Sequence, residues 1–204
     1  MTAARPAGRP KASRAEVMAR VAQRHGAHLL KLTDGVLIVG VRGYYRDTLG
    51  AVGRNDRAIY DDAIFVVTPD AFVAFNANTD PSGYRKGSGT GAGKGMASLN
   101  PGVWPVYRLD MHRRGAKGQH EALCQRAGPV TVTRDGDPPY EDRGMFGINI
   151  HRGGWNTTSS EGCQTLPPDQ WPAFIALVTD QVKRVAGATW RRETLTYVLL
   201  EGWE

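Results

Sequence analysis

Apolar and polar positions near the N-terminus recur with the period of an amphipathic helix. Val17 and Val21 stand at helical spacing after the segment Ser13-Arg14-Ala15-Glu16. The serine and glutamate of that segment match the capping box that opens many helices. Gly26 follows as a natural stop, because glycine readily adopts the backbone conformation that ends a helix. The pattern predicts a helix over residues 14–25.

The middle of the chain carries short apolar runs separated by turn residues, which is typical of strands. Residues 35–41 form a β-branched run between glycines that is too short for a helix. Residues 63–67 and 71–75 flank Thr68-Pro69-Asp70 and predict a hairpin. Further strands are expected at 103–112, 129–134, 145–151 and 194–200, with a turn at 134–139 and loops over 42–62 and 76–102.

A second helix is predicted after residue 169. Asp169 can help cap its start, and Gly187 is expected to end it. Apolar residues lie on one face at a spacing of about 3.6: Trp171, Phe174, Ile175, Val178, Val182 and Val185. We interpret this face, aromatic residues included, as part of the core.

Together these elements predict an α+β, β-rich domain with a helix near each end and a mixed sheet or sandwich between them. Residues 1–12 are expected to be a disordered basic lead, and residues 13–204 a single domain. A chain of 204 residues suits one hydrophobic core. No internal repeat or domain boundary is evident, and the order of elements does not match a doubly wound nucleotide fold.

Composition narrows the class of partner only slightly. The formal net charge is +6, and much of the excess lies in the first 24 residues, which suggests a basic tail. Such a tail suits an anionic partner such as nucleic acid, lipid or cell wall. The sequence shows no apolar core of a secretion signal and no membrane span. We therefore expect synthesis in the cytoplasm without a signal peptide, and no membrane-spanning segment.

The glycine-rich segment GYRKGSGTGAGKGM, residues 83–96, superficially resembles a phosphate-binding loop. The Walker motif requires glycine five positions before its Gly-Lys pair and Ser or Thr directly after it. Here Ser88 precedes Gly93-Lys94 at that distance, and Gly95 follows. Both anchor positions fail, so we expect a linker or a loop near a site, and no nucleotide cofactor.

Candidate chemistry is concentrated in INIHRGGWNTTSSEGCQT, residues 148–165, where His151 precedes Cys163. A thiolate is the reactive form of cysteine, and a neighbouring imidazole can accept the thiol proton. Glycines beside a nucleophile allow close approach of backbone and substrate. With only two cysteines, Cys124 and Cys163, a disulfide scaffold is not expected, and whether the two can pair stays open. His before Cys is also the reverse of the papain order.

This segment resembles the signature of the L,D-transpeptidase (YkuD-like) catalytic domain. That signature has His-Gly at a strand end and then Ser/Thr-His-Gly-Cys, a hydrophobic residue and Arg or Asn. His151, Ser160, Gly162 and Cys163 match its histidine, Ser/Thr, glycine and nucleophile. The resemblance covers residues 148–166 and implies a catalytic role for these four residues within the family's fold.

Three positions depart from the family pattern. Arg152 separates His151 from its glycine, Glu161 replaces the second histidine, and Gln164-Thr165 replaces the hydrophobic–Arg/Asn pair. The last change puts contacts to a substrate carboxylate in doubt. We expect Arg152, Gly153, Trp155 and Gln164 to contact substrate. Trp155 alternatively anchors its loop, and Glu161 either orients His151 or forms a surface ion pair.

The resemblance implies a cofactor-free enzyme that acts on the stem peptide of peptidoglycan. Cys163 would attack a carbonyl on an L-centred diamino acid and form a thioester, with His151 as base and then acid. Backbone N–H groups of Cys163 and a neighbour would hold the oxyanion. A wall enzyme without a signal peptide suits a phage endolysin or a delivered hydrolase, so L,D-carboxypeptidase or endopeptidase activity is favoured over crosslinking.

Four other interpretations stay open. A degenerate, inactive domain could bind cell wall without cleaving it. His112, His120, His151 and Cys163 could hold zinc, although their spacing matches no known signature. A basic nucleic-acid-binding module would use Arg42, Tyr44, Tyr45 and Arg46. The fourth interpretation is that the protein has a structural role in a virion. Instead of binding a metal, His112 could be a structural residue or could contact the catalytic residues without touching the substrate. No metal is expected.

Overall fold

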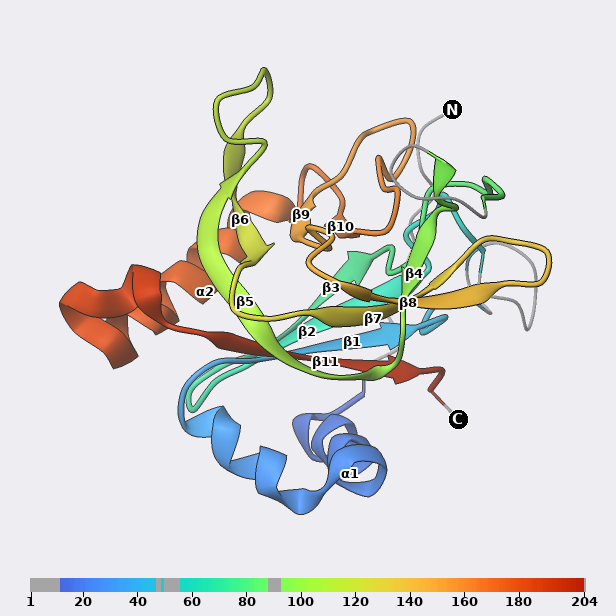
Figure 1. The fold of residues 1–204 in the computed structure, drawn as a ribbon. Coiled ribbons are helices and arrows are strands. Elements are labelled where there is room, and N and C mark those ends of the chain that lie inside the picture. The colour runs from blue at the N-terminus through green and yellow to red at the C-terminus, as the bar shows by residue number, and fades with distance from the viewer. Residues whose placement is uncertain (1–11, 47–48, 50–55, 88–92, 204) are drawn as a thin grey trace.

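The computed structural model describes residues 12–46, 49, 56–87 and 93–203. Within these ranges the protein is a strand-rich α+β structure with one eight-stranded sheet, one three-stranded sheet and a helix near each end (Figure 1). This agrees with the predicted fold class. The predicted disordered lead lies outside the described residues except for Ala12, and so do residues 88–92 of the glycine-rich segment.

The helical segments are α1 (Arg14–His25), the 3-10 segment η1 (Ala27–Asp34), α2 (Trp171–Ala186) and the 3-10 segment η3 (Gly187–Arg192). The strands are β1 (Leu37–Arg42), β2 (Asp62–Val67), β3 (Phe72–Ala77), β4 (Ala97–Leu99), β5 (Gly102–His112), β6 (His120–Gln125), β7 (Val130–Arg134), β8 (Tyr140–Gly144), β9 (Ile150–Arg152), β10 (Gln164–Leu166) and β11 (Leu195–Glu201). In the described part of the chain, no helix is long and apolar enough to span a membrane.

The large sheet is mixed, with strand order β10-β9-β6-β5-β11-β1-β2-β3. The pairs β1–β11 and β9–β10 are parallel, and the other neighbours are antiparallel. The two ends of this order meet, because Asn78, just after β3, exchanges two backbone hydrogen bonds of 2.8 Å with Thr165 in β10. The small sheet has the order β4-β7-β8.

Both faces of the large sheet are covered. Helix α1 lies on one face, where Val17 and Val21 share a buried cluster with Val39 of β1. On the opposite face, Phe174 of α2 belongs to a second buried cluster with Ile38 of β1. Successive strand residues point to opposite faces. Burial on both faces therefore explains why residues 37–41 show no alternation between apolar and polar positions.

The strongest local patterns are confirmed. Helix α1 spans the predicted residues, with Ser13 and Glu16 forming the complete capping box. The hairpin β2–β3 turns at the predicted positions. Helix α2 ends before Gly187 as expected, but its N-cap residue is Gln170 rather than the predicted Asp169.

The prediction of a strand over 145–151 is wrong for most of its length, because β9 begins only at Ile150. The buried side chain of Gln125 explains the difference. Its Oε1 accepts the backbone N–H groups of Phe146, Gly147 and Ile148 at 3.2, 3.0 and 3.1 Å. Backbone donors held by a side chain cannot pair with a neighbouring strand, so this segment is a loop.

Strands β6, β8 and β10 were not predicted. Strand β8 has the polar sequence YEDRG and lies at the end of the small sheet, where no apolar pattern is required. Strand β10 is only three residues long. Strand β4 likewise falls within the predicted loop over 76–102. These strands form through pairing with distant segments rather than through a local pattern.

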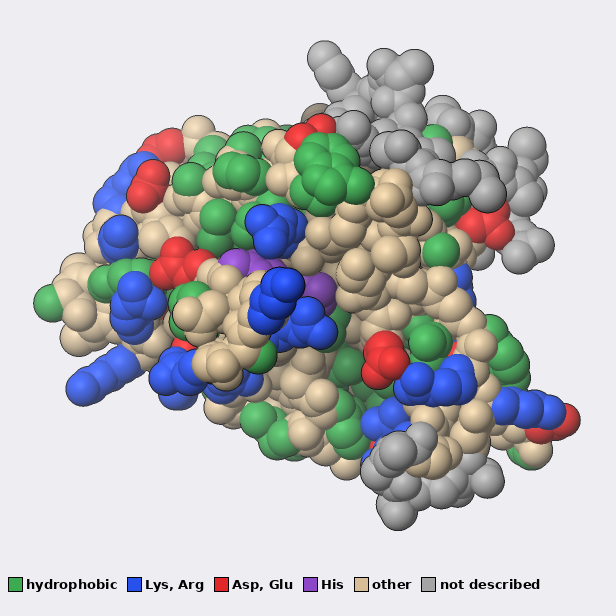
Figure 2. Space-filling view, turned by 90° about the horizontal axis from the view of Figure 1, so that it is seen from above, with side chains coloured by type: hydrophobic (Ala, Val, Ile, Leu, Met, Phe, Trp, Pro, Cys, Tyr) green, Lys and Arg blue, Asp and Glu red, His purple; other side chains and the backbone are tan. Residues whose placement is uncertain are grey.

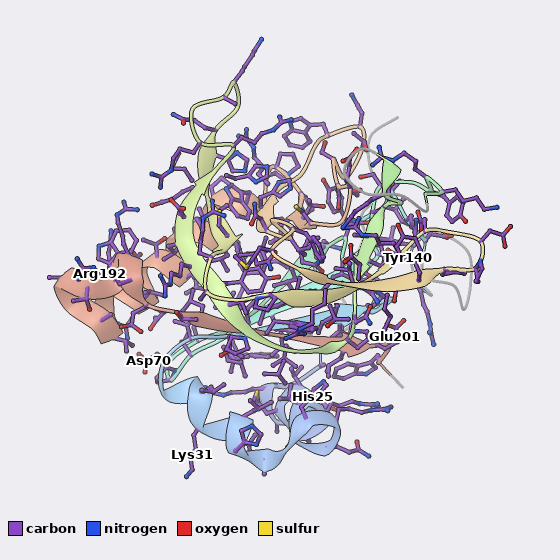
Figure 3. The ribbon with its side chains drawn as sticks, viewed as in Figure 1. His25, Lys31, Asp70, Tyr140, Arg192 and Glu201 are labelled. Atoms are coloured by element: carbon purple, nitrogen blue, oxygen red, sulfur yellow. The ribbon has the colours of Figure 1, made fainter. Side chains whose placement is uncertain are left out.

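The predicted basic–aromatic surface around Arg42 is wrong, because Arg42 and Tyr45 are buried. Arg42 forms ion pairs with Asp80 at 3.3 Å and with Glu201 at 2.8 Å, and Glu201 is labelled at the end of β11 in Figure 3. Tyr44 packs edge-on against Trp203. This cluster therefore stabilises the sheet and is not an open platform for nucleotide bases.

Candidate active site

The parallel pair β9–β10 brings His151 and Cys163 together. Its register pairs Ile150 with Gln164 and His151 with Thr165, and the N–H of Gln164 donates to Asn149 O at 2.8 Å. Cys163 therefore lies beside Asn149, two positions before the partner of His151. Because strand side chains alternate with period two, Cys163 and His151 project to the same face.

The thiol of Cys163 is held by the loop before β9. Its Sγ lies 3.4 Å from the backbone N–H of Asn149 and donates to Gly147 O at 3.3 Å. Burial raises the pKa of Cys163 to about 11, with the N–H of Asn149 opposing this shift and the carboxylate of Glu161 adding to it. The resting group is therefore a protonated thiol at neutral pH.

His151 is 5% exposed and is oriented by its own neighbour. Its Nδ1 lies 2.7 Å from Arg152 O, and since a carbonyl only accepts, Nδ1 carries the proton. The tautomer leaves Nε2 as an acceptor. Burial and the nearby His112 lower the pKa of His151 to about 3, so the imidazole is neutral at physiological pH.

Two further histidines surround His151. The ring of His112 stacks on it with centroids 4.0 Å apart and an interplanar angle of 12°, and the ring of His120 lies 5.9 Å away. Asn149 Nδ2 lies 3.0 Å from Nδ1 of His112, and the N–H of Arg152 donates to Nε2 of His120 at 3.3 Å. Burial, followed by the effect of His120, lowers the pKa of His112 to about 4.

These rings do not form a metal site. No group of three His, Cys, Asp or Glu side chains able to hold an ion occurs among the residues that the structure describes. Several of the ring nitrogens already serve backbone or side-chain partners, as the contacts of His112, His120 and His151 show. Among them, His112 and His151 form a neutral pair of stacked rings beside the thiol.

The turn before Cys163 is built around Ser160 and Gly162. Ser160 Oγ donates to Cys163 O at 2.7 Å and accepts the N–H of Gly162 at 2.9 Å. Gly162 has φ 155°, and a Cβ there would lie 2.5 Å from Ala97 O. Glycine is thus required by a close backbone approach, and the two hydrogen bonds of Ser160 stabilise the turn that carries Cys163.

One backbone donor at the thiol is available. Within the described ranges, the N–H of Cys163 has no hydrogen-bond acceptor, whereas those of Gly162 and Gln164 are bonded to Ser160 Oγ and Asn149 O. The N–H of Cys163 can therefore donate to an atom of a bound ligand. The N–H groups adjacent to it in sequence already have partners.

Cys163 lies between two pockets that also share Glu161. The first, here called the histidine pocket, has a volume of about 510 Å³ and is lined by His112, Arg113, Gly118, His120, His151, Arg152, Gly153, Ser159, Glu161 and Cys163. The second, the cationic pocket, measures about 460 Å³ and is lined by Arg85, Lys94, Gly95, Ala97, Arg134, Phe146, Gly147, Ile148, Glu161, Gly162 and Cys163. Figure 2 shows histidines reaching the surface of one face with Lys and Arg side chains around them.

The predicted substrate-contacting residues divide into two groups. Arg152 and Gly153 line the histidine pocket, whereas Trp155 is 54% exposed and lines neither pocket. Gln164 is fully buried, with Nε2 donating to Gly162 O and Oε1 accepting from Tyr197, so it supports the loop and does not face a ligand. Glu161 pairs with Arg85 at 2.9 Å, which answers whether it orients His151 or forms a surface pair.

Sequence reasoning missed Asn149, Lys94 and Arg134 as site residues. Asn149 stands two positions before His151, so the alternation of side chains along a strand could have identified it as lying on the same face. Lys94 lies in the segment interpreted as a linker, and Arg134 at a strand end interpreted as a turn. Only the tertiary structure brings these cations to Cys163. Both cysteines are free thiols, so Cys124 and Cys163 do not pair.

Comparisons with protein-family models, with curated proteins and with solved structures find no match for this chain.

Proposed function

We propose that this protein is a peptidoglycan-active cysteine peptidase that cleaves the stem peptide at an L-centred diamino acid through a Cys163 thioester. The supporting observation is that Cys163 and His151 project from one parallel strand pair into the same pocket. The sequence resemblance at residues 148–166 adds the substrate class. Hydrolysis, as by an L,D-carboxypeptidase or a phage endolysin, is favoured over transpeptidation.

The resting charges set how the first step runs. Thiol and imidazole are both neutral, with pKa values of about 11 and about 3, so a preformed thiolate–imidazolium pair is disfavoured. The thiol proton therefore moves to Nε2 of His151 as the carbon–sulfur bond forms. Displacement of water by substrate strengthens this transfer, because interactions between charges grow in a drier site.

The remaining steps reuse the same groups. The protonated His151 gives its proton to the leaving amine as the carbon–nitrogen bond breaks, which leaves a thioester on Cys163. Water then attacks the thioester carbonyl, His151 accepts a proton from that water, and the sulfur leaves and is reprotonated. The N–H of Cys163 points to stabilisation of the oxyanion in both tetrahedral intermediates.

Purified protein incubated with peptidoglycan provides the test, with the muropeptides analysed by mass spectrometry. We expect shortened stem peptides, and a loss of at least about 10³-fold in rate for Cys163→Ala, as when other covalent nucleophiles are removed. The matched control is Cys124→Ala, which removes the other thiol from a buried position in β6 that lines neither pocket.

The products decide between the possible outcomes. Shortened stems indicate hydrolysis, and new crosslinks indicate transpeptidation. Unchanged muropeptides from the folded wild-type protein, or equal products from Cys163→Ala, would rule out the proposed chemistry. Retained binding to peptidoglycan without any new product would instead indicate a non-catalytic wall-binding protein.

A further inference from the structure

The cationic pocket is lined by the proposed nucleophile Cys163 and by none of the three histidines of the histidine pocket. Lys94 and Arg134 reach it from segments 40 residues apart in sequence and lie near Gly162 and Cys163 on its wall. Arg134 is buried, and 27% of the Lys94 side chain is exposed. The steps assigned to Cys163 and His151 use neither cation, so their position beside the thiol needs a separate explanation.

Two cations in this pocket share one carboxylate. Asp142 accepts from Lys94 Nζ at 2.6 Å and from Arg134 Nε at 2.7 Å through the same oxygen. Arg85 is already balanced by Glu161. One positive charge therefore stays uncompensated next to the thiol, and a negatively charged ligand group would balance it.

The positions of the two cations are fixed by further contacts. The ring of Phe146 lies 5.2 Å from Lys94 Nζ and 4.8 Å from the Arg134 guanidinium. Arg134 Nη1 also donates to Gly95 O at 2.9 Å. Phe146 belongs to the same loop as Gly147, whose carbonyl oxygen accepts a hydrogen bond from the Cys163 thiol. One loop therefore positions both the thiol and the cations. Such preorganisation favours binding.

The direction of the reaction assigns each pocket to one part of the substrate. The acid that protonates the leaving amine must lie near that amine, so the leaving part belongs on the His151 side. The acyl part of the substrate then lies outside the histidine pocket. The other pocket that Cys163 lines is the cationic pocket.

We infer that the cationic pocket is the acyl-side subsite and selects a substrate whose acyl residue carries a free side-chain carboxylate, bound by Lys94 and Arg134. This inference rests on the proposed function for the identity of the acyl residue. A diamino acid with a side-chain carboxylate fits the positive charge. Its amide lacks the charge, and a lysine in the same place brings a second cation toward Lys94.

The probes are three synthetic stem tetrapeptides that differ only at the third residue. One carries a diamino acid with a free side-chain carboxylate, one its side-chain amide, and one lysine. Binding is measured by calorimetry with the Cys163→Ala protein, so that turnover does not interfere. We expect the carboxylate peptide to bind about tenfold or more tightly than the other two, as charge-assisted hydrogen bonds typically provide.

Two substitutions in the Cys163→Ala background assign the preference to the pocket. Lys94→Gln is expected to reduce the preference to less than about threefold, because one of the two charges is removed. Its partner control, Lys86→Gln, breaks the exposed pair with Asp137 in the same region and lines neither pocket, so it should leave the preference unchanged. Thermal unfolding checks that each variant is folded.

Equal binding of the carboxylate and amide peptides would overturn the inference even if the wild-type protein cleaves both, and so would the absence of binding by all three. A preference that survives in folded Lys94→Gln would overturn the assignment to this pocket. A carboxylate preference lost in Lys94→Gln, together with uncleaved peptides in the wild type, would support the subsite and refute the proposed hydrolysis.

Discussion

The two pockets beside Cys163 differ in the charge that their walls carry. In the histidine pocket, burial holds the stacked imidazoles of His112 and His151 in their neutral form. In the cationic pocket, Lys94 and Arg134 share Asp142 as their carboxylate partner. The first wall can accept a proton and the second cannot, while only the second attracts an anion.

This difference shows how one thiol can lie beside both a neutral base and a group of binding cations. A base must lose its charge to be useful, and desolvation by surrounding rings provides that. A binding cation must keep its charge, and a carboxylate partner provides that. Sharing one carboxylate between two cations retains part of the attraction for a ligand. The following predictions test whether the two walls really work in these separate ways.

The largest effect is expected from removing the base. His151→Gln keeps a polar side chain of similar reach but cannot accept a proton, so kcat should fall by about 10²- to 10⁴-fold. KM for a stem peptide should change little, because the charged contact assigned to binding lies in the cationic pocket. Steady-state kinetics with a synthetic tetrapeptide measures both constants.

The control for this substitution is His28→Gln, an exposed histidine in η1 on the far face of the sheet. It should leave both constants unchanged. A folded His151→Gln protein with kcat within about threefold of the wild type would remove the distinction between a proton-accepting wall and a binding wall.

The next effect concerns the charge of the thiol itself. Since the pKa of Cys163 is raised to about 11, the thiolate fraction should increase about tenfold for each pH unit between 7 and 10. Alkylation by iodoacetamide in a Cys124→Ala background, followed by mass spectrometry, reports this fraction at one site. The rate should therefore be about 100-fold higher at pH 9 than at pH 7.

A different pH dependence of the alkylation rate would contradict the stated difference in charge between the two pockets. A plateau in the alkylation rate between pH 5 and 8 would mean that the thiol transfers its proton to His151 at rest. The histidine wall would then be charged in the free protein, and it would resemble the cationic wall rather than contrast with it.

The smallest effect is expected at Glu161, which lines both pockets. Its carboxylate contributes to the raised pKa of Cys163, so Glu161→Gln should lower that pKa and speed alkylation at pH 8. The gain should be about two- to fivefold, because an exposed charge is screened by solvent and salt. Glu141→Gln on β8, exposed and outside both pockets, is the matched control. A slower rate in Glu161→Gln would contradict the stated sign.

Local signals were sufficient for much of this molecule. The capping box of α1, the hairpin β2–β3 and the apolar face of α2 are confirmed because each depends on residues close in sequence. The pairing of His151 with Cys163 could also be anticipated, since both lie within 12 residues of each other. Ser160 and Gly162 lie in the turn before Cys163, and their predicted catalytic role stays a prediction.

The walls of the two pockets could not be predicted in the same way. His112 and His120 reach His151 because β6 pairs with both β5 and β9, and β6 has no alternating pattern of its own. Gln125 similarly prevents a strand at 146–148 through contacts more than 20 residues away. Such contacts depend on tertiary structure, which no short window of sequence records.

The meeting of β3 and β10 has a consequence for association between molecules. A free sheet edge offers unpaired N–H and C=O groups to any passing strand and promotes aggregation. The two bonds between Asn78 and Thr165 occupy such groups at the point where both edges of the large sheet converge. The chain thus supplies a partner for its own edge strand, so the loop that carries Cys163 is anchored and these edge groups are not offered to a second molecule.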